Sequence, residues 1–384
     1  MSATIRIRAY NVRFGDCILL SVPDNGSTRH VLFDFGNAPG KFGTNEGFDE
    51  IAKNIQKTTG GTLDLVVMTH EHLDHMEGFY SERKIFDKIK VRRVWMSIPS
   101  QPGYYDTHKK SKKGMAAMQK MLGQFQRTFA ARQRELGTSM PEIEALLLNN
   151  LSNVQRIDYV RGLAEKKKVH YLYRGAKLTG THDFQNVKFK ILAPEEEMSL
   201  YYKKAQQLAE GALGFRKSMA PKTRKLTPPS HISTTEFARL RENLQAGEMD
   251  TLHHIDKAAN NTSLVVLVEA AGKKLLFPGD AEVESWDMMR KKKKLGPVDF
   301  LKVAHHGSWN GTPEFDGKSV LETLFPPGHG KNGVALISTK RDVYGDIHPV
   351  PDAKTIELLK KCCKKVVITE DDVPANKVFV DITL

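Results

Sequence analysis

Three histidines and an aspartate directly follow an apolar run, and this arrangement constrains the fold of the 384-residue chain more than any other feature. The stretch Leu63-Asp64-Leu65-Val66-Val67-Met68 predicts a buried strand, and Thr69-His70-Glu71-His72-Leu73-Asp74-His75 comes after it. Side chains at these spacings cannot all share one helix face, but they can converge from a loop that leaves a strand. Imidazole nitrogens and carboxylate oxygens are ligands for zinc, manganese and iron. We therefore expect His70 and His72 to hold one ion. Asp74 and His75 would hold a second.

Three further segments carry candidate metal-site residues at the ends of predicted strands. Residues 30–36 end in Asp34-Phe35-Gly36, residues 274–281 contain Gly279-Asp280, and residues 299–308 end in His305-His306-Gly307-Ser308. A lone His-x-His is often a surface accident, and a lone Gly-Asp is a common turn. Four such segments in order are much harder to obtain by chance, and together they favour a metal site.

This series resembles the His-x-His-x-Asp-His signature and its companion segments in the metallo-β-lactamase superfamily. The resemblance implies that Asp34 orients a metal-binding histidine and that Asp280 bridges two ions. It also implies that His305 or His306 completes the second ion's ligands. We favour His305 because it follows the strand directly.

Other segments are similar to the metallo-β-lactamase domains of bacterial competence (DNA-uptake) proteins. They are residues 11–20, Asn260-Asn261-Thr262-Ser263, His-His-Gly-Ser and Tyr344-Gly345-Asp346-Ile347-His348-Pro349. The likeness covers about residues 5–98, 169–194 and 258–361. Those relatives are thought to be nucleases. The resemblance implies that His348 donates a proton or neutralises a phosphate, although a structural role in a turn is equally compatible with its sequence.

One departure concerns the first ion. Many superfamily members have a third histidine where this chain reads Asn260-Asn261-Thr262, with His253 and His254 further upstream. Either His253 or His254 folds back as a ligand, or the first ion has fewer protein ligands and depends on Asp280 and water. We prefer the second interpretation, which leaves Mn²⁺ as plausible as Zn²⁺ for the two divalent ions.

The pattern of strands and helices predicts an α/β (α+β) fold. Short apolar runs fall near 4–11, 16–22, 30–35, 63–69, 91–96, 169–174, 186–192, 263–269, 273–278, 299–304, 333–338, 365–369 and 377–383. Helical spacing falls near 48–58, 79–90, 281–293 and 351–363. This matches a four-layer αββα metallo-β-lactamase sandwich. We assign residues 1–96 and 258–384 to its two halves, with a helix-rich basic insertion over 97–257 that returns to the sandwich at about 169–194.

The insertion holds nearly all of the excess positive charge. Residues 97–250 contain 26 Lys and Arg against 15 Asp and Glu, a balance of +11, compared with +13 for the whole chain. An apolar stripe that includes Met115, Met118, Leu122, Phe125 and Phe129 predicts a packed helix, and two more helices are expected near 198–212 and after Phe237. Residues 216–233 read as a linker. A solvated surface explains any one basic cluster, but together they favour a polyanionic partner such as nucleic acid or a nucleotide. An exposed helical insertion could equally form a homodimer face or a lid over the substrate.

Little in the sequence favours an export route or a membrane. The N-terminus enters a strand pattern without a signal peptide, and no apolar run approaches the roughly 18 residues needed to span a bilayer. The three cysteines, Cys17, Cys362 and Cys363, give no disulfide framework. These features predict a cytoplasmic protein without a membrane partner.

The resemblance and the charge together predict a metal-dependent hydrolase. The favoured activity is that of a phosphodiesterase or nuclease in which metal-bound hydroxide attacks phosphorus, with Asp74, His348 and Asp34 assisting at the site. One alternative is a hydrolase of a small ester, lactone or β-lactam, because the superfamily fold does not fix the substrate. An alternative of another class is an inactive metal-binding adaptor for nucleic acid or protein.

Overall fold

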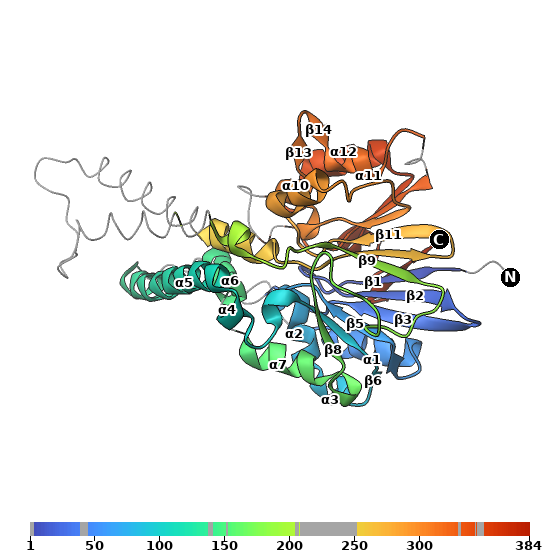
Figure 1. Cartoon of the computed structure of the whole chain (residues 1–384), viewed down its shortest axis with the longest axis horizontal. Coiled ribbons are helices and arrows are strands. Elements are labelled where there is room, and N and C mark those ends of the chain that lie inside the picture. Colours follow the sequence, from blue (N-terminus) through green and yellow to red (C-terminus); the bar gives the residue numbers. More distant parts are fainter. Residues whose placement is uncertain are drawn as a thin grey trace, which may run out of the picture.

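Two β-sheets face each other in the protein (Figure 1). The computed structural model describes residues 4–38, 45–136, 141–150, 153–203, 207, 252–328, 332–341, 343 and 349–384. The seven-stranded sheet has the order β17 (Phe379–Thr383), β1 (Arg6–Tyr10), β2 (Ile18–Asp24), β3 (Ser27–Phe33), β5 (Leu65–Met68), β7 (Val94–Ser97) and β8 (Val169–Leu172). The six-stranded sheet has the order β16 (Lys365–Ile368), β15 (Val334–Ile337), β12 (Phe300–Lys302), β11 (Lys273–Phe277), β10 (Val265–Ala270) and β9 (Lys188–Ala193). Two short pairs, β4 (Thr62–Leu63) with β6 (Lys90–Val91) and β13 (Glu314–Phe315) with β14 (Lys318–Ser319), lie apart from these sheets.

The space between the sheets is filled by apolar side chains from both. Successive strand residues point to opposite faces, so Leu20 and Val22 face the other sheet while Leu19 faces the outer helices. Phe33 of β3 and Phe277 of β11 stack across the interface with ring centroids 4.0 Å apart. A strand that is buried on both faces has a nearly continuous run of apolar residues in its sequence. Such runs predicted these strands.

Helices cover the outer face of each sheet. The buried faces of α1 (Phe48–Thr58), α2 (Leu73–Ser81), α3 (Arg83–Phe86) and α7 (Val154–Gly162) pack on the seven-stranded sheet. The six-stranded sheet is covered by α10 (Val283–Lys291), α11 (Val320–Leu324) and α12 (Ala353–Cys362), and α13 (Thr369–Asp372) follows β16. The side chain of Asp352 caps α12 by accepting a hydrogen bond from Thr355 N at 2.8 Å. The expectation of a mixed α/β fold is confirmed.

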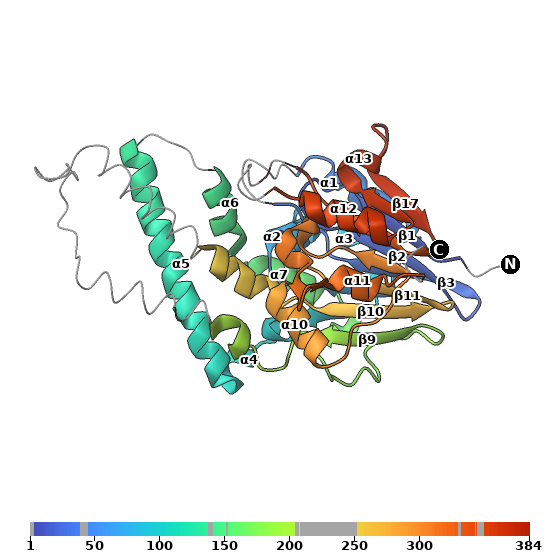
Figure 2. The same ribbon diagram turned by 90° about the horizontal axis from the view of Figure 1, so that it is seen from above.

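A separate group of helices lies at the end of the sandwich away from the C-terminus (Figure 2). It contains α4 (Tyr104–Thr107), α5 (Lys109–Leu136) and α6 (Pro141–Asn150). The helix expected from the stripe that includes Met115, Met118 and Phe125 is α5, and these side chains pack with Tyr202 in a small core of their own. The residues expected to form the third helix, and the linker at 216–233, lie outside the described residues. Within the described part of the chain, no helix is both long enough and apolar enough to cross a bilayer.

One helix boundary differs from the sequence expectation. The sequence predicts a helix near 79–90, whereas α2 begins at Leu73 and α3 ends at Phe86. His70 and His72 therefore lie on a loop, but Asp74 and His75 lie in the first turn of a helix. The side chain of Asn149 in α6 fixes this start, because its Oδ1 accepts a hydrogen bond from Leu73 N at 2.7 Å.

Candidate metal centre

The candidate site residues lie where strands of both sheets end at the same edge. Strands β3 and β5 run parallel in one sheet, and β11 and β12 run parallel in the other. Asp34 follows β3, and Asp280 follows β11. The loop and helix start after β5 carry the histidine-rich run, and a 3₁₀ turn of residues His305–Gly307 follows β12. The two sheets thus bring residues separated by more than 200 positions to one edge.

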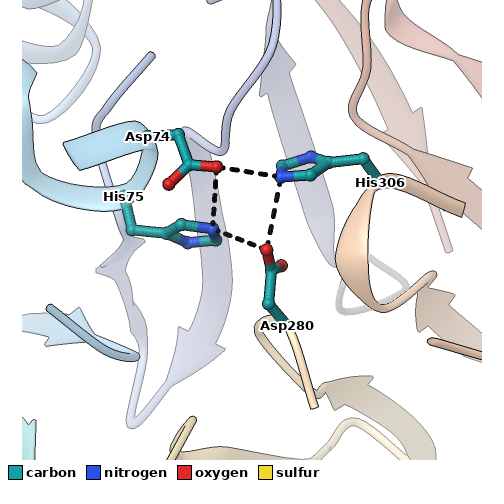
Figure 3. A group of neighbouring side chains, drawn as sticks. All are labelled: Asp74, His75, Asp280 and His306. Carbon is teal, nitrogen blue, oxygen red and sulfur yellow. Dashed lines mark hydrogen bonds and ion pairs between the residues drawn. The ribbon is translucent and has the colours of Figure 1, made fainter. Parts of the chain in front are cut away.

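Four buried side chains from both halves of the chain point toward one another (Figure 3). Asp280 Oδ2 lies 3.1 Å from His75 Nε2 and 3.3 Å from His306 Nε2. Asp74 Oδ2 lies 3.2 Å from His306 Nε2 and 3.9 Å from His75 Nε2. All four residues are at most 2% exposed. Two carboxylates and two imidazoles at these distances form a donor set that suits a divalent cation.

A second donor group shares Asp74 with the first. The ligating atoms of His70, His72 and Asp74 lie within 4.8 Å of one another, and all three side chains are buried. The rings of His70 and His75 are 4.2 Å apart between centroids, so the two groups are neighbours. His72 Nε2 also lies 3.2 Å from Asn150 Oδ1 of α6. The run 70–75 therefore contributes to two adjacent groups.

Hydrogen bonds on the far side of two rings orient the nitrogens that face the first group. Asp34 Oδ2 accepts from His75 Nδ1 at 2.8 Å, and Asp34 is itself held by Thr69 N and Thr69 Oγ1 at 2.7 Å each. The carbonyl oxygen of Ser338 accepts from His306 Nδ1 at 2.8 Å. When Nδ1 of a neutral imidazole carries the proton, Nε2 has a free lone pair. Both rings thus present Nε2 to the space between Asp74 and Asp280.

A buried lysine and a further aspartate belong to this site, and the sequence analysis did not select them. Lys302, at the end of β12, forms an ion pair with Asp16 and lies 3.2 Å from Asp280 Oδ1. Its Nζ also donates to the carbonyl oxygen of Gly279 at 3.1 Å. The signal was available, because a lysine inside Phe300-Leu301-Lys302-Val303-Ala304 must reach a partner if the strand is buried. Asp16, the partner of Lys302, could have been selected in the same way, because it directly precedes the apolar run that begins at Cys17.

The surrounding charges shift the pKa values of the histidines in different directions. Burial lowers the pKa of His70, and the rings of His75 and His72 lower it further, so this imidazole is neutral near pH 7. Burial also opposes the charged form of His306, but Asp280 and Asp74 outweigh it and raise its pKa to about 9. The pKa of His75 is raised for the same reason, with Asp280 as the main opposing charge. Without a cation, protons on these rings balance the carboxylates.

The donor atoms fit bound cations. Within the described part of the chain, the buried atoms His70 Nε2 and Asp74 Oδ1 have no hydrogen-bond partner. Asp16, Asp34, Asp74 and Asp280 are at most 2% exposed, and Lys302 is the only lysine or arginine paired with any of them among the described residues. Buried charge and unpaired polar atoms cost free energy unless a partner compensates them. Divalent cations would supply that partner.

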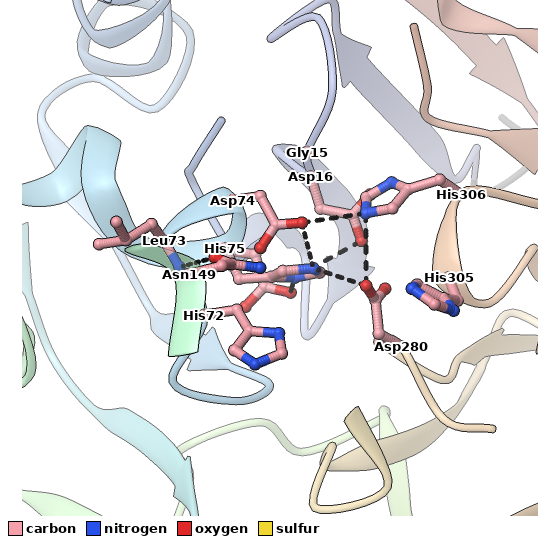
Figure 4. Close-up of polar contacts among 12 residues, drawn as sticks. Gly15, Asp16, His72, Leu73, Asp74, His75, Asn149, Asp280, His305 and His306 are labelled. Atoms are coloured by element: carbon pink, nitrogen blue, oxygen red, sulfur yellow. Dashed lines mark hydrogen bonds and ion pairs between the residues drawn. The ribbon is translucent and has the colours of Figure 1, made fainter. Parts of the chain in front are cut away.

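The adjacent histidines after β12 lie in different groups. His306 joins Asp74, His75 and Asp280, whereas His305 lies beside Asp280 with its Nδ1 3.3 Å from Glu282 Oε1 (Figure 4). Both residues have positive φ, 48° and 53°, so the chain reverses sharply before Gly307. The geometry therefore places His306 in the position for which the sequence analysis favoured His305.

Two other expectations concern the first ion and the late histidine. His253 and His254 lie on a helix over 252–260, and neither belongs to any group of potential ligands among the described residues. The same helix instead places Asp256 Oδ1 3.9 Å from His72 Nε2. Asn260 follows one turn later. His348 lies outside the described residues, so its expected role stays a prediction.

Comparison with known proteins gives one partial similarity. The chain is 33% identical over 87 residues to Recombination protein 2 of Haemophilus influenzae. The match covers 23% of this chain and 10% of the relative, so the shared segment is a small part of both proteins. No protein-family model matches the chain. The observations define a mixed α/β protein with a buried histidine and aspartate site suited to metal.

Proposed function

We propose that the protein is a metallo-β-lactamase-fold hydrolase that cleaves phosphodiester bonds, with nucleic acid or a nucleotide as its substrate. The observation that carries the proposal is the convergence of Asp74, His75, Asp280 and His306 from both sheets, next to His70 and His72. Bound divalent ions would activate a water molecule and offset the negative charge that develops on the oxygens around phosphorus. Zn²⁺ and Mn²⁺ both accept this mixture of imidazole and carboxylate ligands.

The chain's own residues hold the ligands in place before substrate binds. Asp34 fixes the ring of His75, and the carbonyl oxygen of Ser338 fixes that of His306. Lys302 compensates part of the charge of Asp16 and Asp280, which limits repulsion among the carboxylates. Ligands that are already oriented lose little conformational freedom when they bind an ion or a substrate.

A polyanionic substrate is supported by charge and by the partial relative. The insertion carries +11 of the net charge, and Lys109, Lys110, Lys112 and Lys113 at the start of α5 are exposed. Helix α5 contacts α6, and α6 holds the metal-binding loop through Asn149 and Asn150. Lysine side chains on this helix would attract a phosphate backbone and release its counterions. The partial relative is named for recombination, which fits a nucleic-acid substrate.

Hydrolysis of bis(p-nitrophenyl) phosphate and nicking of plasmid DNA, with Mn²⁺ or Zn²⁺ added, test this proposal. The parent should turn over both substrates. Asp280→Ala and His72→Ala should lose at least about 100-fold in activity, since removing even residues that support a ligand costs roughly 10–100-fold. Asp49→Asn, an exposed carboxylate on α1, is the matched control and should retain the parent rate.

The outcomes separate the alternatives. Turnover of nitrocefin or a lactone without phosphodiester cleavage would favour a small-molecule hydrolase. DNA retention without any hydrolysis would favour a metal-binding adaptor. Phosphodiester cleavage that persists unchanged in Asp280→Ala would place the chemistry elsewhere and refute the proposed site.

A further inference from the structure

A separate cluster of ligating side chains lies beside the proposed metal pair. Asp256 comes from the helix over 252–260, Glu282 from the turn after β11, and His305 from the turn after β12. One ligating atom from each lies within 4.8 Å of those of the other two. Asp256 and Glu282 are 8% and 1% exposed, and the His305 side chain is 17% exposed. Three elements distant in sequence thus converge on a point that the metal pair does not use.

The amide of Asn260 occupies the centre of this cluster. Its Nδ2 lies 2.8 Å from Glu282 Oε1, 3.2 Å from Asp256 Oδ2 and 3.3 Å from His305 Nε2. One NH₂ group has two hydrogens and cannot satisfy three acceptors at once. Asn260 is 1% exposed, and its Oδ1 has no hydrogen-bond partner among the described residues. The amide is therefore crowded on its donor side and unpaired on its acceptor side.

A half-turn of that amide would give its unpaired oxygen a partner if a cation were present. The half-turn exchanges Oδ1 and Nδ2, and so brings the oxygen toward the two carboxylates and the imidazole. Three oxygens and one nitrogen would then face a common point. Without a cation, this orientation would oppose the amide oxygen to two carboxylates, which is unfavourable.

The charges around the cluster also leave it short of a positive partner. In the described part of the chain, the ion-pair contacts of Asp256 and Glu282 are with histidines, His72 at 3.9 Å and His305 at 3.3 Å. Asn310 Nδ2 donates to Glu282 Oε2 at 2.6 Å, and Asn150 Nδ2 donates to Asp256 Oδ1 at 2.7 Å. The remaining oxygen of each carboxylate faces Asn260. Buried carboxylates with neutral partners are costly unless a cation or a proton compensates them.

We propose that Asp256, Glu282 and His305, with Asn260 Oδ1, hold a further divalent cation next to the Asp74, His75, Asp280 and His306 group. Two carboxylates, an amide oxygen and an imidazole are predominantly hard ligands, and they suit Mn²⁺ better than a thiolate-preferring ion. The site would explain why His305 lies next to His306 but in a different group. It does not require the proposed phosphodiesterase activity.

Manganese stoichiometry of the purified full chain tests the site. Protein stripped with a chelator is titrated with MnCl₂, free Mn²⁺ is followed by its electron paramagnetic resonance signal, and bound metal is counted after gel filtration. Glu282→Gln, which keeps the shape of the side chain, should bind one equivalent fewer than the parent, and His305→Ala should show the same loss. Glu284→Gln changes a more exposed carboxylate two residues away and should bind as the parent does.

A variant that lacks ligands of the metal pair tests whether the further cation binds independently of that pair. The double variant His75→Ala with Asp280→Asn removes ligands of the pair and should retain the equivalent that Glu282→Gln then abolishes. Circular dichroism of each variant checks that it is folded. Equal stoichiometry in the parent and Glu282→Gln would overturn the proposal and leave the cluster as a hydrogen-bonded network. Loss of this equivalent in a protein with no phosphodiesterase activity would retain the proposal while refuting the proposed function.

Discussion

Protonation of His306 makes the charge of the candidate metal centre depend on pH. Burial lowers its pKa, but Asp280 and Asp74 raise it to about 9, above the value of about 6.5 expected in the unfolded chain. A group whose pKa is higher in the folded state stabilises that state fully below the unfolded pKa, and this contribution is lost as pH rises through the folded pKa. For metal-free protein we expect the contribution of His306 to the free energy of unfolding to fall by up to about 3 kcal/mol between about pH 6.5 and pH 9.

Urea unfolding in the presence of a chelator, at a series of pH values, measures this loss. His306→Asn removes the titrating group, so the stability difference between the parent and this variant should shrink as pH rises. His30→Asn, in β3, is the control. Burial lowers the pKa of His30, so the stability difference between the parent and this variant should not shrink as pH rises above 6.5. A parent-to-variant difference that stays constant across the range would contradict the assignment.

The residues of the site were predictable where a side chain follows a buried strand. Asp34 follows β3 and Asp280 follows β11, at the strand ends that the sequence indicated. The choice between His305 and His306 was not predictable, because both adopt positive φ in a turn whose direction depends on Gly307 and on packing beyond it. Asp256 was missed for another reason: it lies on a helix whose position relative to the sheets is fixed only by tertiary contacts.

At the scale of elements, the close approach of two backbone segments positions the start of α2. A Cβ atom on residue 36, in place of the glycine hydrogen, would lie 2.3 Å from Leu73 O and 2.4 Å from His75 N, which are backbone atoms and cannot move alone. Gly36→Ala should therefore push the turn that carries the candidate ligands Asp74 and His75 away from the end of β3. We expect it to destabilise the protein by about 1–3 kcal/mol or more and to weaken metal binding, because overpacking of this kind displaces the backbone.

Thermal unfolding and Mn²⁺ titration of Gly36→Ala test this expectation. Gly162, the last residue of α7, supplies the matched control, because a Cβ atom at that position would have nothing within 4 Å. Gly162→Ala should leave metal binding unchanged and raise stability by up to about 1 kcal/mol, because alanine is the better helix residue. Parent-like metal affinity in Gly36→Ala would show that this contact does not position the turn.

The elements themselves differed in how far the sequence could predict them. Strand β5 is buried on both faces, as are the last three residues of β11, so their apolar runs identified them. The start of α2 was hidden, because Leu73-Asp74-His75 carries candidate metal ligands rather than an apolar stripe and is held by Asn149 from α6. That contact joins segments 76 positions apart, and no local pattern records it.

At the scale of the whole molecule, the candidate metal centre joins the two sheets. Asp74 and His75 are attached to the seven-stranded sheet, and Asp280 and His306 to the six-stranded sheet. The apolar interface, including the stacked Phe33 and Phe277, holds the sheets together behind the site. A cation bound by all four side chains would therefore stabilise the contact between the halves, and its removal would destabilise the whole fold.

Metal removal should accordingly lower the melting temperature of the parent in one cooperative transition. A ligand that binds only the folded state at 100 times its Kd adds about 2.7 kcal/mol of stability per site. Asp280→Asn should lose most of this metal-dependent increase, because it removes the charge of the six-stranded half's carboxylate that lies 3.1 Å from His75 of the seven-stranded half. Differential scanning calorimetry with Mn²⁺ and with chelator measures the shift, and Asp49→Asn serves as the control with the parent's response. A full metal-dependent shift in Asp280→Asn, or none in the parent, would show that the ions do not join the two halves through these ligands.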